Sequence, residues 1–142
     1  MKLLENKVAL ITGAGRGIGK AIAIRFASEG CNIAFTDIAL SDFVLETEKE
    51  LQAMGIQAKA YASNAANFAE TQQVVEEIVK DFGRIDVLVN NAGITKDTAL
   101  KRMTEEQWDA VINVNLKSVF NFTKAVMAIN HQRISYPTIK KV

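Results

Sequence analysis

Cysteine and proline are nearly absent from this chain, which has one of each, Cys31 and Pro137, in 142 residues. A lone cysteine cannot form an internal disulfide, and because Cys31 lies in an apolar, strand-like run we expect a buried thiol. The sequence also lacks a basic or acidic run, and its formal net charge is only +1, so charge gives no basis for binding nucleic acid. No apolar stretch approaches the roughly 18 residues of a membrane span.

A secretory signal is missing as well, because the opening residues, MKLLENKVAL, are too few and too charged to form one. We therefore expect a cytoplasmic protein without membrane contact. The single histidine, His131, has no cluster of metal-binding neighbours, so we expect no metal site. What is present is an ordinary globular composition, 49% hydrophobic and 23% charged, over a length that suits one domain.

Short apolar runs alternate with helical patterns along the chain. We expect strands at 7–12, 31–36, 57–62 and 85–90. Three of these runs are nearly continuous in apolar residues, which is typical of parallel strands covered on both faces. We expect helices at about 17–30, 41–55, 67–83 and 104–129, with amino-terminal capping patterns at Asn67 and Thr104. The alternation predicts an α/β fold with a doubly wound parallel sheet and helices on both faces.

A glycine-rich segment, TGAGRGIG, follows the first expected strand and opens the first helix. In this context glycines let the backbone turn tightly and approach phosphates, and the helix amino terminus faces their negative charge. The segment therefore predicts a site for a dinucleotide pyrophosphate; the alternative is a glycine-rich turn with no ligand. The residues that we assign to the site are Thr12, Gly13, Gly15, Arg16, Gly17, Ile18 and Gly19.

Asp37 follows Gly19 by 18 residues and stands at the end of the second expected strand. A carboxylate at this place accepts hydrogen bonds from the adenosine ribose hydroxyls and repels a 2′-phosphate, which favours NAD. Arg16 favours NADP, because a guanidinium can pair with that phosphate. We expect NAD first, with NADP as the alternative. The structural alternatives are that Asp37 starts a turn and that Arg16 is a solvated charge.

Three motifs in order, TGAGRGIG, NNAG at 90–93 and NVNL at 113–116, resemble the short-chain dehydrogenase/reductase family over residues 1–127. Residues 90–126 are most similar to its 3-oxoacyl-[acyl-carrier-protein] reductases. The resemblance implies a Rossmann-type dinucleotide-binding domain over 1–127, incomplete at four strands and about four helices, and a non-homologous tail over 128–142. It also implies reduction of a 3-oxoacyl thioester on acyl carrier protein, in fatty acid biosynthesis, by an NAD(P)-dependent homo-oligomeric enzyme.

The same resemblance assigns further site residues. Asn115, in NVNL, matches the catalytic asparagine that helps hold a water-mediated proton relay. Asn64 lies where the family contacts adenine, although this chain has Ser63-Asn64 where the family usually has Asp-Val. The motif beside the adenosine and ribose comprises Asn90, Ala92 and Gly93. As ordinary structural residues, Asn90 would cap the strand end and Asn115 would be an amide on a helix surface.

Tyr136 and Lys140 have the Tyr-x-x-x-Lys spacing of the family's proton-transfer pair, in which the lysine lowers the phenol pKa. Tyr136 follows Asn115 by only 21 residues, which leaves no room for the strand and serine that precede this pair in the family. Pro137 also disfavours helical backbone angles at Tyr136. We interpret the pair as a coincidental match, the chain as truncated at its carboxyl end, and the chain alone as inactive. The alternatives are a non-catalytic dinucleotide-binding or subunit-association module, and a reductase of another alcohol or sugar.

An end after four strands would leave the fourth strand as an open, apolar edge of the sheet. The last helix, over 104–129, would be long and only partly covered. We expect Trp108 to pack in the core or at an interface. We expect exposed apolar side chains at Val111, Val119, Phe120, Phe122 and Val126.

Overall fold

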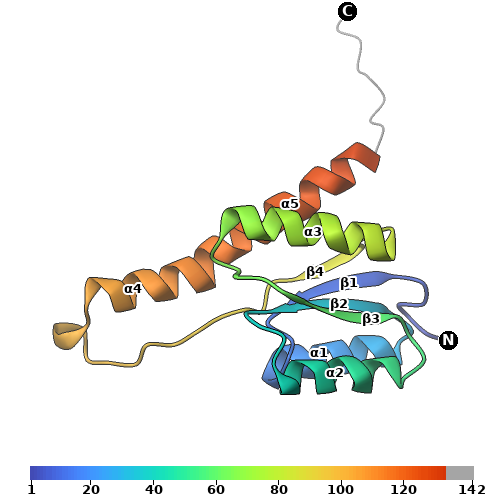
Figure 1. Cartoon of the computed structure of the whole chain (residues 1–142), viewed down its shortest axis with the longest axis horizontal. Coiled ribbons are helices and arrows are strands. Elements are labelled where there is room, and N and C mark those ends of the chain that lie inside the picture. Colours follow the sequence, from blue (N-terminus) through green and yellow to red (C-terminus); the bar gives the residue numbers. More distant parts are fainter. Residues whose placement is uncertain (134–142) are drawn as a thin grey trace, which may run out of the picture.

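Four parallel strands form the centre of the molecule, whose computed structural model describes residues 1–133 (Figure 1). The strands are β1 (Val8–Thr12), β2 (Asn32–Asp37), β3 (Ala58–Ala62) and β4 (Val87–Val89). Their order in the sheet is β3-β2-β1-β4, and each neighbouring pair is parallel. The four predicted strands and the doubly wound α/β fold are confirmed, and β1 lies beside β4 as that fold requires.

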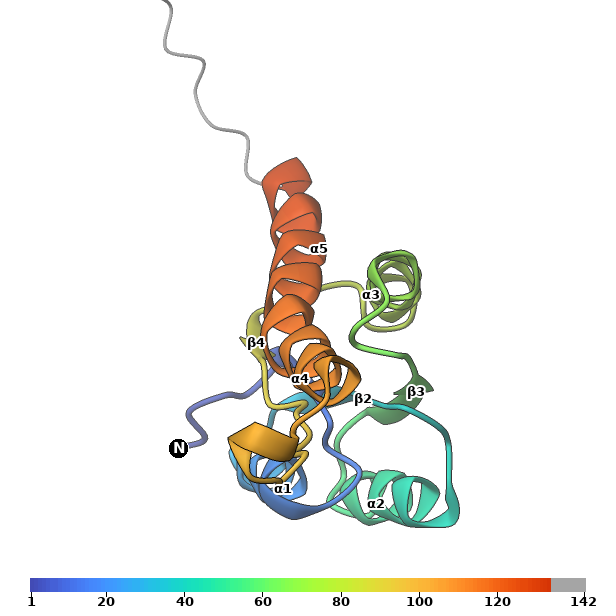
Figure 2. The same ribbon diagram turned by 90° about the vertical axis from the view of Figure 1, so that its left-hand side faces the viewer.

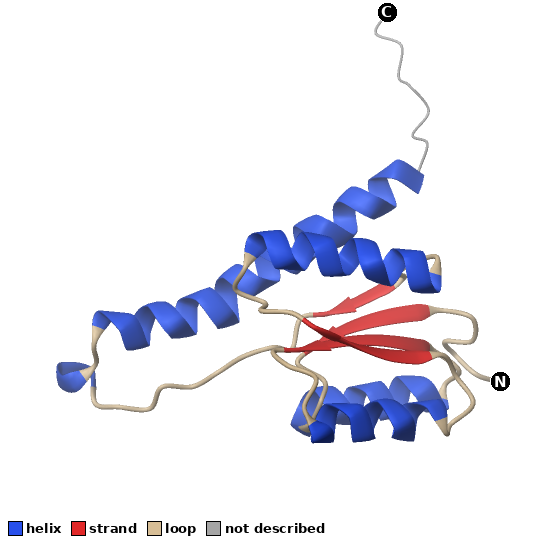
Figure 3. Ribbon diagram, viewed as in Figure 1, coloured by secondary structure: helices blue, strands red, loops and turns tan. Residues whose placement is uncertain are grey.

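Helices cover both faces of the sheet, as predicted. One face carries α1 (Gly17–Ser28) and α2 (Asp42–Gln52), and the opposite face carries α3 (Phe68–Phe82) and α5 (Ser118–Arg133) (Figures 1 and 2). The alternating colours of strands and helices along the chain in Figure 3 show that each strand is joined to the next through a helix. Parallel strands need such crossovers because a tight turn cannot return the chain to the same end of the sheet.

Both faces of the central strands are buried, which explains their continuous apolar runs. On β1, Ile11 packs into the core shared with α1 and α2, whereas its neighbour Leu10 packs into the core shared with α3 and α5. Phe35 on β2 and Phe122 on α5 are the largest fully buried side chains on their respective sides. Each such ring stabilises the fold by about 2–3 kcal/mol through removal of apolar surface from water.

Helix ends follow their local sequence signals. Asn67 caps α3 by accepting a hydrogen bond from the amide of Glu70, and Gly83 ends that helix in the left-handed conformation at φ 81°. Thr104 and Gln107 form a reciprocal capping box at the start of α4 (Glu105–Ile112). Both predicted caps are therefore present, because capping depends on residues within one turn of each other.

The last expected helix is not uniform. After the short 3-10 turn η1 (Leu100–Arg102), α4 passes into a π-helical turn, η2 (Asn113–Lys117), and then into α5. The prediction of one regular helix over 104–129 is wrong in this respect, because η2 contains wider backbone turns. In Figure 1 α4 projects beyond the end of the strands, while α5 lies over the sheet beside α3.

This projection decides which apolar side chains are covered. Trp108 on α4 is 56% exposed, so its expected place in the core is wrong and the expected interface stays a prediction. Phe120 and Val119 are exposed as expected, but Phe122 and Val126 are buried against the sheet, contrary to expectation. β4 is an edge strand whose three residues are only half-buried, which confirms the predicted open edge within the described residues.

The thiol of Cys31 is buried, as predicted, and its burial raises the pKa to about 11, so it remains protonated at neutral pH. Among residues 1–130, whose side chains the structure describes, Cys, Asp and Glu do not gather in a group that could hold a metal ion. No helix in the same part of the chain combines the length and apolarity needed to cross a membrane.

Candidate dinucleotide site

The glycine-rich loop packs closely against the residues after β4. Gly13 has φ +67°, and a Cβ there would lie 2.9 Å from the Cα of Ala92. A Cβ on Gly19 would lie 2.5 Å from the Asn91 Nδ2 and 2.6 Å from the Gly13 carbonyl oxygen. Both positions require glycine, because Gly13 meets the backbone of Ala92 and Gly19 meets the Asn91 side-chain amide and the backbone of the loop itself. The sequence motifs TGAGRGIG and NNAG are thereby brought together.

Gly17 has a different environment from these two glycines. It has φ +60°, and a Cβ there would meet no described atom within 4 Å. Gly17 begins α1, and Arg16 at the N-cap makes no capping hydrogen bond with its side chain. The first amide N–H groups of a helix have no acceptor within the helix, so this end of α1 is suited to bind an anion.

Asn91 joins the ends of β1 and β4. Its Nδ2 donates to the carbonyl oxygens of Thr12 and Gly13, each at 3.0 Å. The Thr12 Oγ1 in turn accepts from the backbone amides of Asn91 at 3.0 Å and Ala92 at 2.9 Å. Thr12 is buried, and its hydroxyl is hydrogen-bonded to the segment after β4. It therefore holds the loop in place and does not line the cavity described next.

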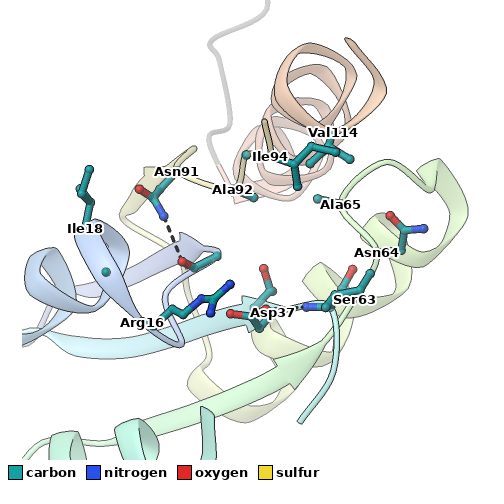
Figure 4. A pocket seen from close by; sticks show the side chains of 15 residues that line it. Arg16, Ile18, Asp37, Ser63, Asn64, Ala65, Asn91, Ala92, Ile94 and Val114 are labelled. Atoms are coloured by element: carbon teal, nitrogen blue, oxygen red, sulfur yellow. Dashed lines mark hydrogen bonds between the residues drawn. The ribbon is translucent and has the colours of Figure 1, made fainter. Parts of the chain in front are cut away.

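A cavity of about 490 Å³ opens at this end of the sheet (Figure 4). Figure 4 shows Ile18 at one end of it, Arg16 and Asp37 in the middle, and Asn64 at the other end. The predicted site residues that line it are Gly13, Arg16, Gly17, Ile18, Asp37, Asn64, Ala92 and Gly93. The lining residues that sequence reasoning did not assign are Thr36, Ile38, Ser63, Ala65, Asn91, Ile94 and Val114.

Most of these unassigned residues are adjacent in sequence to assigned residues at the carboxyl ends of strands. They could have been found by including, at each strand end, the neighbours of the residue that was assigned. Asn90, which was assigned, does not line the cavity; its Nδ2 donates to Thr123 Oγ1 on α5 at 3.2 Å, and the adjacent Asn91 takes its place. Which of the two consecutive asparagines faces the loop depends on where β4 ends, which is Val89 in the structure. The sequence alone does not fix that end.

Asp37 closes the middle of the cavity. Its Oδ2 accepts from the Gly15 amide at 3.2 Å and its Oδ1 accepts from the Ile38 amide at 2.9 Å. The Arg16 guanidinium lies 5.4 Å from the centre of the Phe43 ring, a cation–π distance. Arg16 and Asp37 are the two ionisable side chains among the lining residues, so the cavity presents one positive and one negative charge side by side.

The far end of the cavity is formed by the turn between β3 and α3. Asn64 accepts from the Ala66 amide through Oδ1 at 3.0 Å, and its own amide donates to Glu70 Oε2 at 2.9 Å. Glu70 also accepts from the Asn67 Nδ2 through Oε1 at 3.1 Å, so its carboxylate links the cap of α3 to this turn. The Ser63 hydroxyl is buried and has no partner among the described residues.

Asn115 does not line the cavity but fixes one of its walls. In η2, its Oδ1 accepts from the Ile94 amide at 2.8 Å and its Nδ2 donates to the Ile94 carbonyl at 2.9 Å. Both side-chain polar groups are thus paired with one backbone residue of the segment after β4. The π-helical turn that carries Asn115 is a feature often found at functional sites.

A proton-transfer tyrosine is absent from the cavity within the described residues. Tyr61 lies on β3 and donates to the Asp81 Oδ2 at 2.6 Å; burial and then this carboxylate raise its pKa far above the ordinary value. Tyr136 and Lys140 lie outside the described residues. The described lining can therefore bind and orient a ligand, and it contains no His, Cys, Tyr or Lys side chain.

Comparison with known proteins agrees with this geometry. The chain is 50% identical over 124 residues to the 3-oxoacyl-[acyl-carrier-protein] reductase FabG of Thermotoga maritima, covering 87% of this chain and 50% of that protein. It is 47% identical over 121 residues to FabG of Staphylococcus epidermidis, covering 85% of this chain and 50% of that protein. The chain thus spans about half the length of these curated relatives.

Solved structures match over the same half. A short chain dehydrogenase from Burkholderia cenocepacia in complex with NADP superposes with TM-score 0.85 at 34% identity, covering 88% of this chain and 51% of that one. An NAD⁺-bound xylitol dehydrogenase superposes with TM-score 0.88 at 31% identity, covering 93% and 51%. The sequence profile described as short chain dehydrogenase matches residues 7–134. The chain belongs to the short chain dehydrogenase family, which is a family of oxidoreductases with a Rossmann-type nucleotide-binding fold.

Proposed function

We propose that this chain forms the dinucleotide-binding part of an NAD(P)-dependent 3-oxoacyl-[acyl-carrier-protein] reductase, acting in cytoplasmic fatty acid biosynthesis. The single observation that carries the proposal is the cavity between the glycine loop and the segment after β4, with the open amino end of α1 at Gly17. The identity of about half to the FabG relatives supports this substrate class over others in the family.

The residues present fit a nicotinamide dinucleotide. The amino end of α1 would hold the pyrophosphate, and the empty space beside Gly17 leaves room for the phosphates to approach the backbone. Asp37 would hold the adenosine ribose, and the turn at Ser63 and Asn64 would hold the adenine. When bound, the nicotinamide supplies the hydride. The role of this chain is then to fix that ligand and to shield one face of it from water.

We propose NAD as the preferred ligand and NADP as the alternative. The Asp37 carboxylate is held at the end of β2 by two backbone amides, so its charge is fixed where a 2′-phosphate would lie. Arg16 rests on the Phe43 ring beside it, and this position supports some affinity for NADP. The two similar structures that contain NADP and NAD⁺ show that members of the family bind either nucleotide.

We propose further that the chain alone turns over little or no substrate. Asn115, the one assigned catalytic residue in the described part, is engaged with the Ile94 backbone, and this contact positions the wall of the site without supplying a proton. Tyr136 and Lys140 stay a coincidental match in this proposal. The chain would therefore hold the cofactor half of the reaction and lack the proton-transfer half.

A paired experiment tests the proposal. Titration calorimetry of the 142-residue chain with NAD⁺ and NADP⁺ should detect binding of at least one. An assay with an acetoacetyl thioester and NADH or NADPH, followed at the absorbance of the reduced nicotinamide, should detect no turnover. Absence of binding by both nucleotides would overturn the proposed function. Turnover that Tyr136→Phe abolishes would instead show that the tail is catalytic.

A second candidate function is a non-catalytic module that associates with full-length subunits. The exposed aromatic side chains favour it: Phe68 on α3 and Phe120 on α5 stack with ring centres 6.1 Å apart, and both are substantially exposed. Co-purification with a longer reductase, lost in Phe120→Ser but kept in Lys96→Ser, would support this function. A reductase of another alcohol or sugar is the third candidate, and the similarity to xylitol dehydrogenase is consistent with it.

A further inference from the structure

Thr47 is a buried polar residue on the apolar side of α2. It lies between Val44 and Leu51, which are fully buried, and is itself 1% exposed. Valine has nearly the same shape and would fill this place without a polar atom. A buried hydroxyl is costly unless it is hydrogen-bonded. The Thr47 hydroxyl has a specific partner, because its Oγ1 donates to the Gly15 carbonyl oxygen at 2.8 Å.

This bond completes a clamp on Gly15. The Gly15 amide donates to Asp37 Oδ2 at 3.2 Å, and its carbonyl accepts from Thr47, so both backbone polar groups are held by residues distant in sequence. Glycine has more backbone freedom than other residues, so an unclamped Gly15 would sample several peptide orientations. A Cβ at Gly15 would lie 2.6 Å from Asp37 Oδ2 and 2.7 Å from Val44 Cγ2, so position 15 has no room for a residue with a side chain. Its orientation therefore depends on the two hydrogen bonds of the clamp.

The clamp also determines the next amide. A trans peptide is planar, with its C=O and N–H pointing in opposite directions, and the described residues contain no cis peptide. Because the Gly15 carbonyl points to the buried hydroxyl on α2, the Arg16 N–H points away from α2. Arg16 is the N-cap of α1 and lines the cavity.

We infer that Thr47 is a positioning residue for the dinucleotide site: by holding the Gly15 carbonyl, it orients the Arg16 amide and the amino end of α1 toward the phosphates of the ligand. The inference rests on the proposed dinucleotide function. Thr47 itself does not line the cavity. Its effect is on the affinity for the phosphates of the ligand and not on the affinity for the adenine base.

Three variants separate this role from a general effect on packing. Thr47→Val removes the hydroxyl and keeps the shape, whereas Thr47→Ser keeps the hydroxyl. Thr71→Val is the matched control, because Thr71 is equally buried on a helix but its hydroxyl donates to the Phe68 carbonyl of the same helix. The probes are NAD⁺ by calorimetry and adenosine, which has no phosphate, by ligand-observed NMR. Thermal unfolding reports the stability of each variant.

Thr47→Val should weaken NAD⁺ binding about 3- to 10-fold, the range for one lost hydrogen bond, and leave adenosine binding unchanged. Thr47→Ser and Thr71→Val should remain within about 2-fold of the unaltered chain. In the unaltered chain, the amide NMR signal of Arg16 should shift on addition of NAD⁺, a measurement that does not depend on any variant folding.

The results also distinguish this inference from the proposed function. If the unaltered chain binds NAD⁺ but Thr47→Val binds it equally well, or if Thr47→Val loses adenosine to the same degree, the positioning role is wrong and the proposed function stands. An Arg16 amide that does not respond to bound NAD⁺ also overturns the positioning role alone. If the unaltered chain binds no dinucleotide, both are overturned.

Discussion

The Asn91 side chain donates from one nitrogen to the carbonyl oxygens of Thr12 and Gly13, at 3.0 Å each. One amide group therefore satisfies the last carbonyl of β1 and the first carbonyl of the glycine loop. These carbonyls lie where the parallel ladder between β1 and β4 ends, so they would otherwise lack partners in a half-buried place. The site depends on this contact because it fixes the loop to the segment that forms the opposite wall of the cavity.

Asn91→Ala should lower the free energy of unfolding by about 1–3 kcal/mol, because it leaves two carbonyls without their donor. Asn90→Ala is the matched control: it removes a single exposed bond to Thr123, at 3.2 Å, and should cost less than about 1 kcal/mol. Urea denaturation followed by circular dichroism measures both. Equal losses in the two variants would show that Asn91 does not join the two segments as described.

Gly17 and Gly55 form a natural pair for testing the phosphate site. Both have positive φ, +60° and +82°, and a Cβ at either meets no described atom within 4 Å. Alanine at either position should therefore lower the free energy of unfolding by a similar amount, about 1 kcal/mol, because a residue with a Cβ disfavours the left-handed backbone conformation. Only Gly17 lines the cavity. Gly17→Ala should weaken NAD⁺ binding at least about 10-fold because its methyl occupies the path of the phosphates, corresponding to about 1.4 kcal/mol.

The same calorimetric titration on Gly55→Ala should give the affinity of the unaltered chain. If both variants lose affinity equally, the loss comes from a general fall in stability, and the assignment of phosphates to the end of α1 is wrong.

Asp86 provides a pH-dependent contribution to stability. Burial alone would raise its pKa, but hydrogen bonds from Arg84 and from the Val8 amide, the latter at 2.9 Å, outweigh burial and hold the pKa below the ordinary 3.8. A carboxyl whose pKa is lower in the folded state stabilises the fold fully above its unfolded-state pKa. The contribution is lost as the pH falls below 3.8 and through the folded-state pKa.

Asp86→Asn should therefore be less stable than the unaltered chain by about 1 kcal/mol at pH 7, with the difference shrinking as the pH falls below the ordinary carboxyl range. Urea denaturation at a series of pH values between neutral and about 2.5 measures this difference. The exposed Asp97 on the loop before η1 gives the control, since Asp97→Asn should leave the curve unchanged. A difference that persists undiminished in acid would mean that the charge of Asp86 is not the cause.

Features governed by neighbouring residues could be predicted from the sequence. The capping box of Thr104 and Gln107 and the helix end at Gly83 are local, and both are present. The order of the strands also follows from βαβ alternation, since few arrangements of right-handed crossovers are available. The glycine loop and NNAG could be brought together on that basis alone.

Features governed by distant contacts could not be predicted. Nothing near Thr47 indicates that its hydroxyl bonds to a carbonyl 32 residues earlier. The exposure of Trp108 follows from the projection of α4 beyond the sheet, and a helical pattern contains no information on what covers the helix. The choice between Asn90 and Asn91 depends on the residue at which β4 ends, and strand ends are poorly specified by sequence.

Asp37 offers the sharpest test of the preferred nucleotide. Its carboxylate is held by the Gly15 and Ile38 amides at the place assigned to the adenosine ribose. A 2′-phosphate there would be repelled, and the repulsion between two charges about 4–6 Å apart near a surface is on the order of 1–3 kcal/mol. Asp37→Asn removes the negative charge and leaves one side-chain oxygen, which can still accept from either the Gly15 or the Ile38 amide. The ratio of the NADP⁺ to NAD⁺ dissociation constants should therefore fall about 10-fold or more, as measured by calorimetry.

Two further variants complete this test. Asp42→Asn, at the exposed start of α2 and outside the cavity lining, should leave the ratio unchanged. Arg16→Ala in the Asp37→Asn background should reverse the gain in NADP⁺ affinity, because Arg16 is then the nearest cation to the phosphate in the cavity lining. If Asp37→Asn changes both affinities by the same factor, the carboxylate supports the loop through Gly15 and does not select the nucleotide. The preference for NAD would then have to come from the shape of the cavity around Ile38 and not from charge.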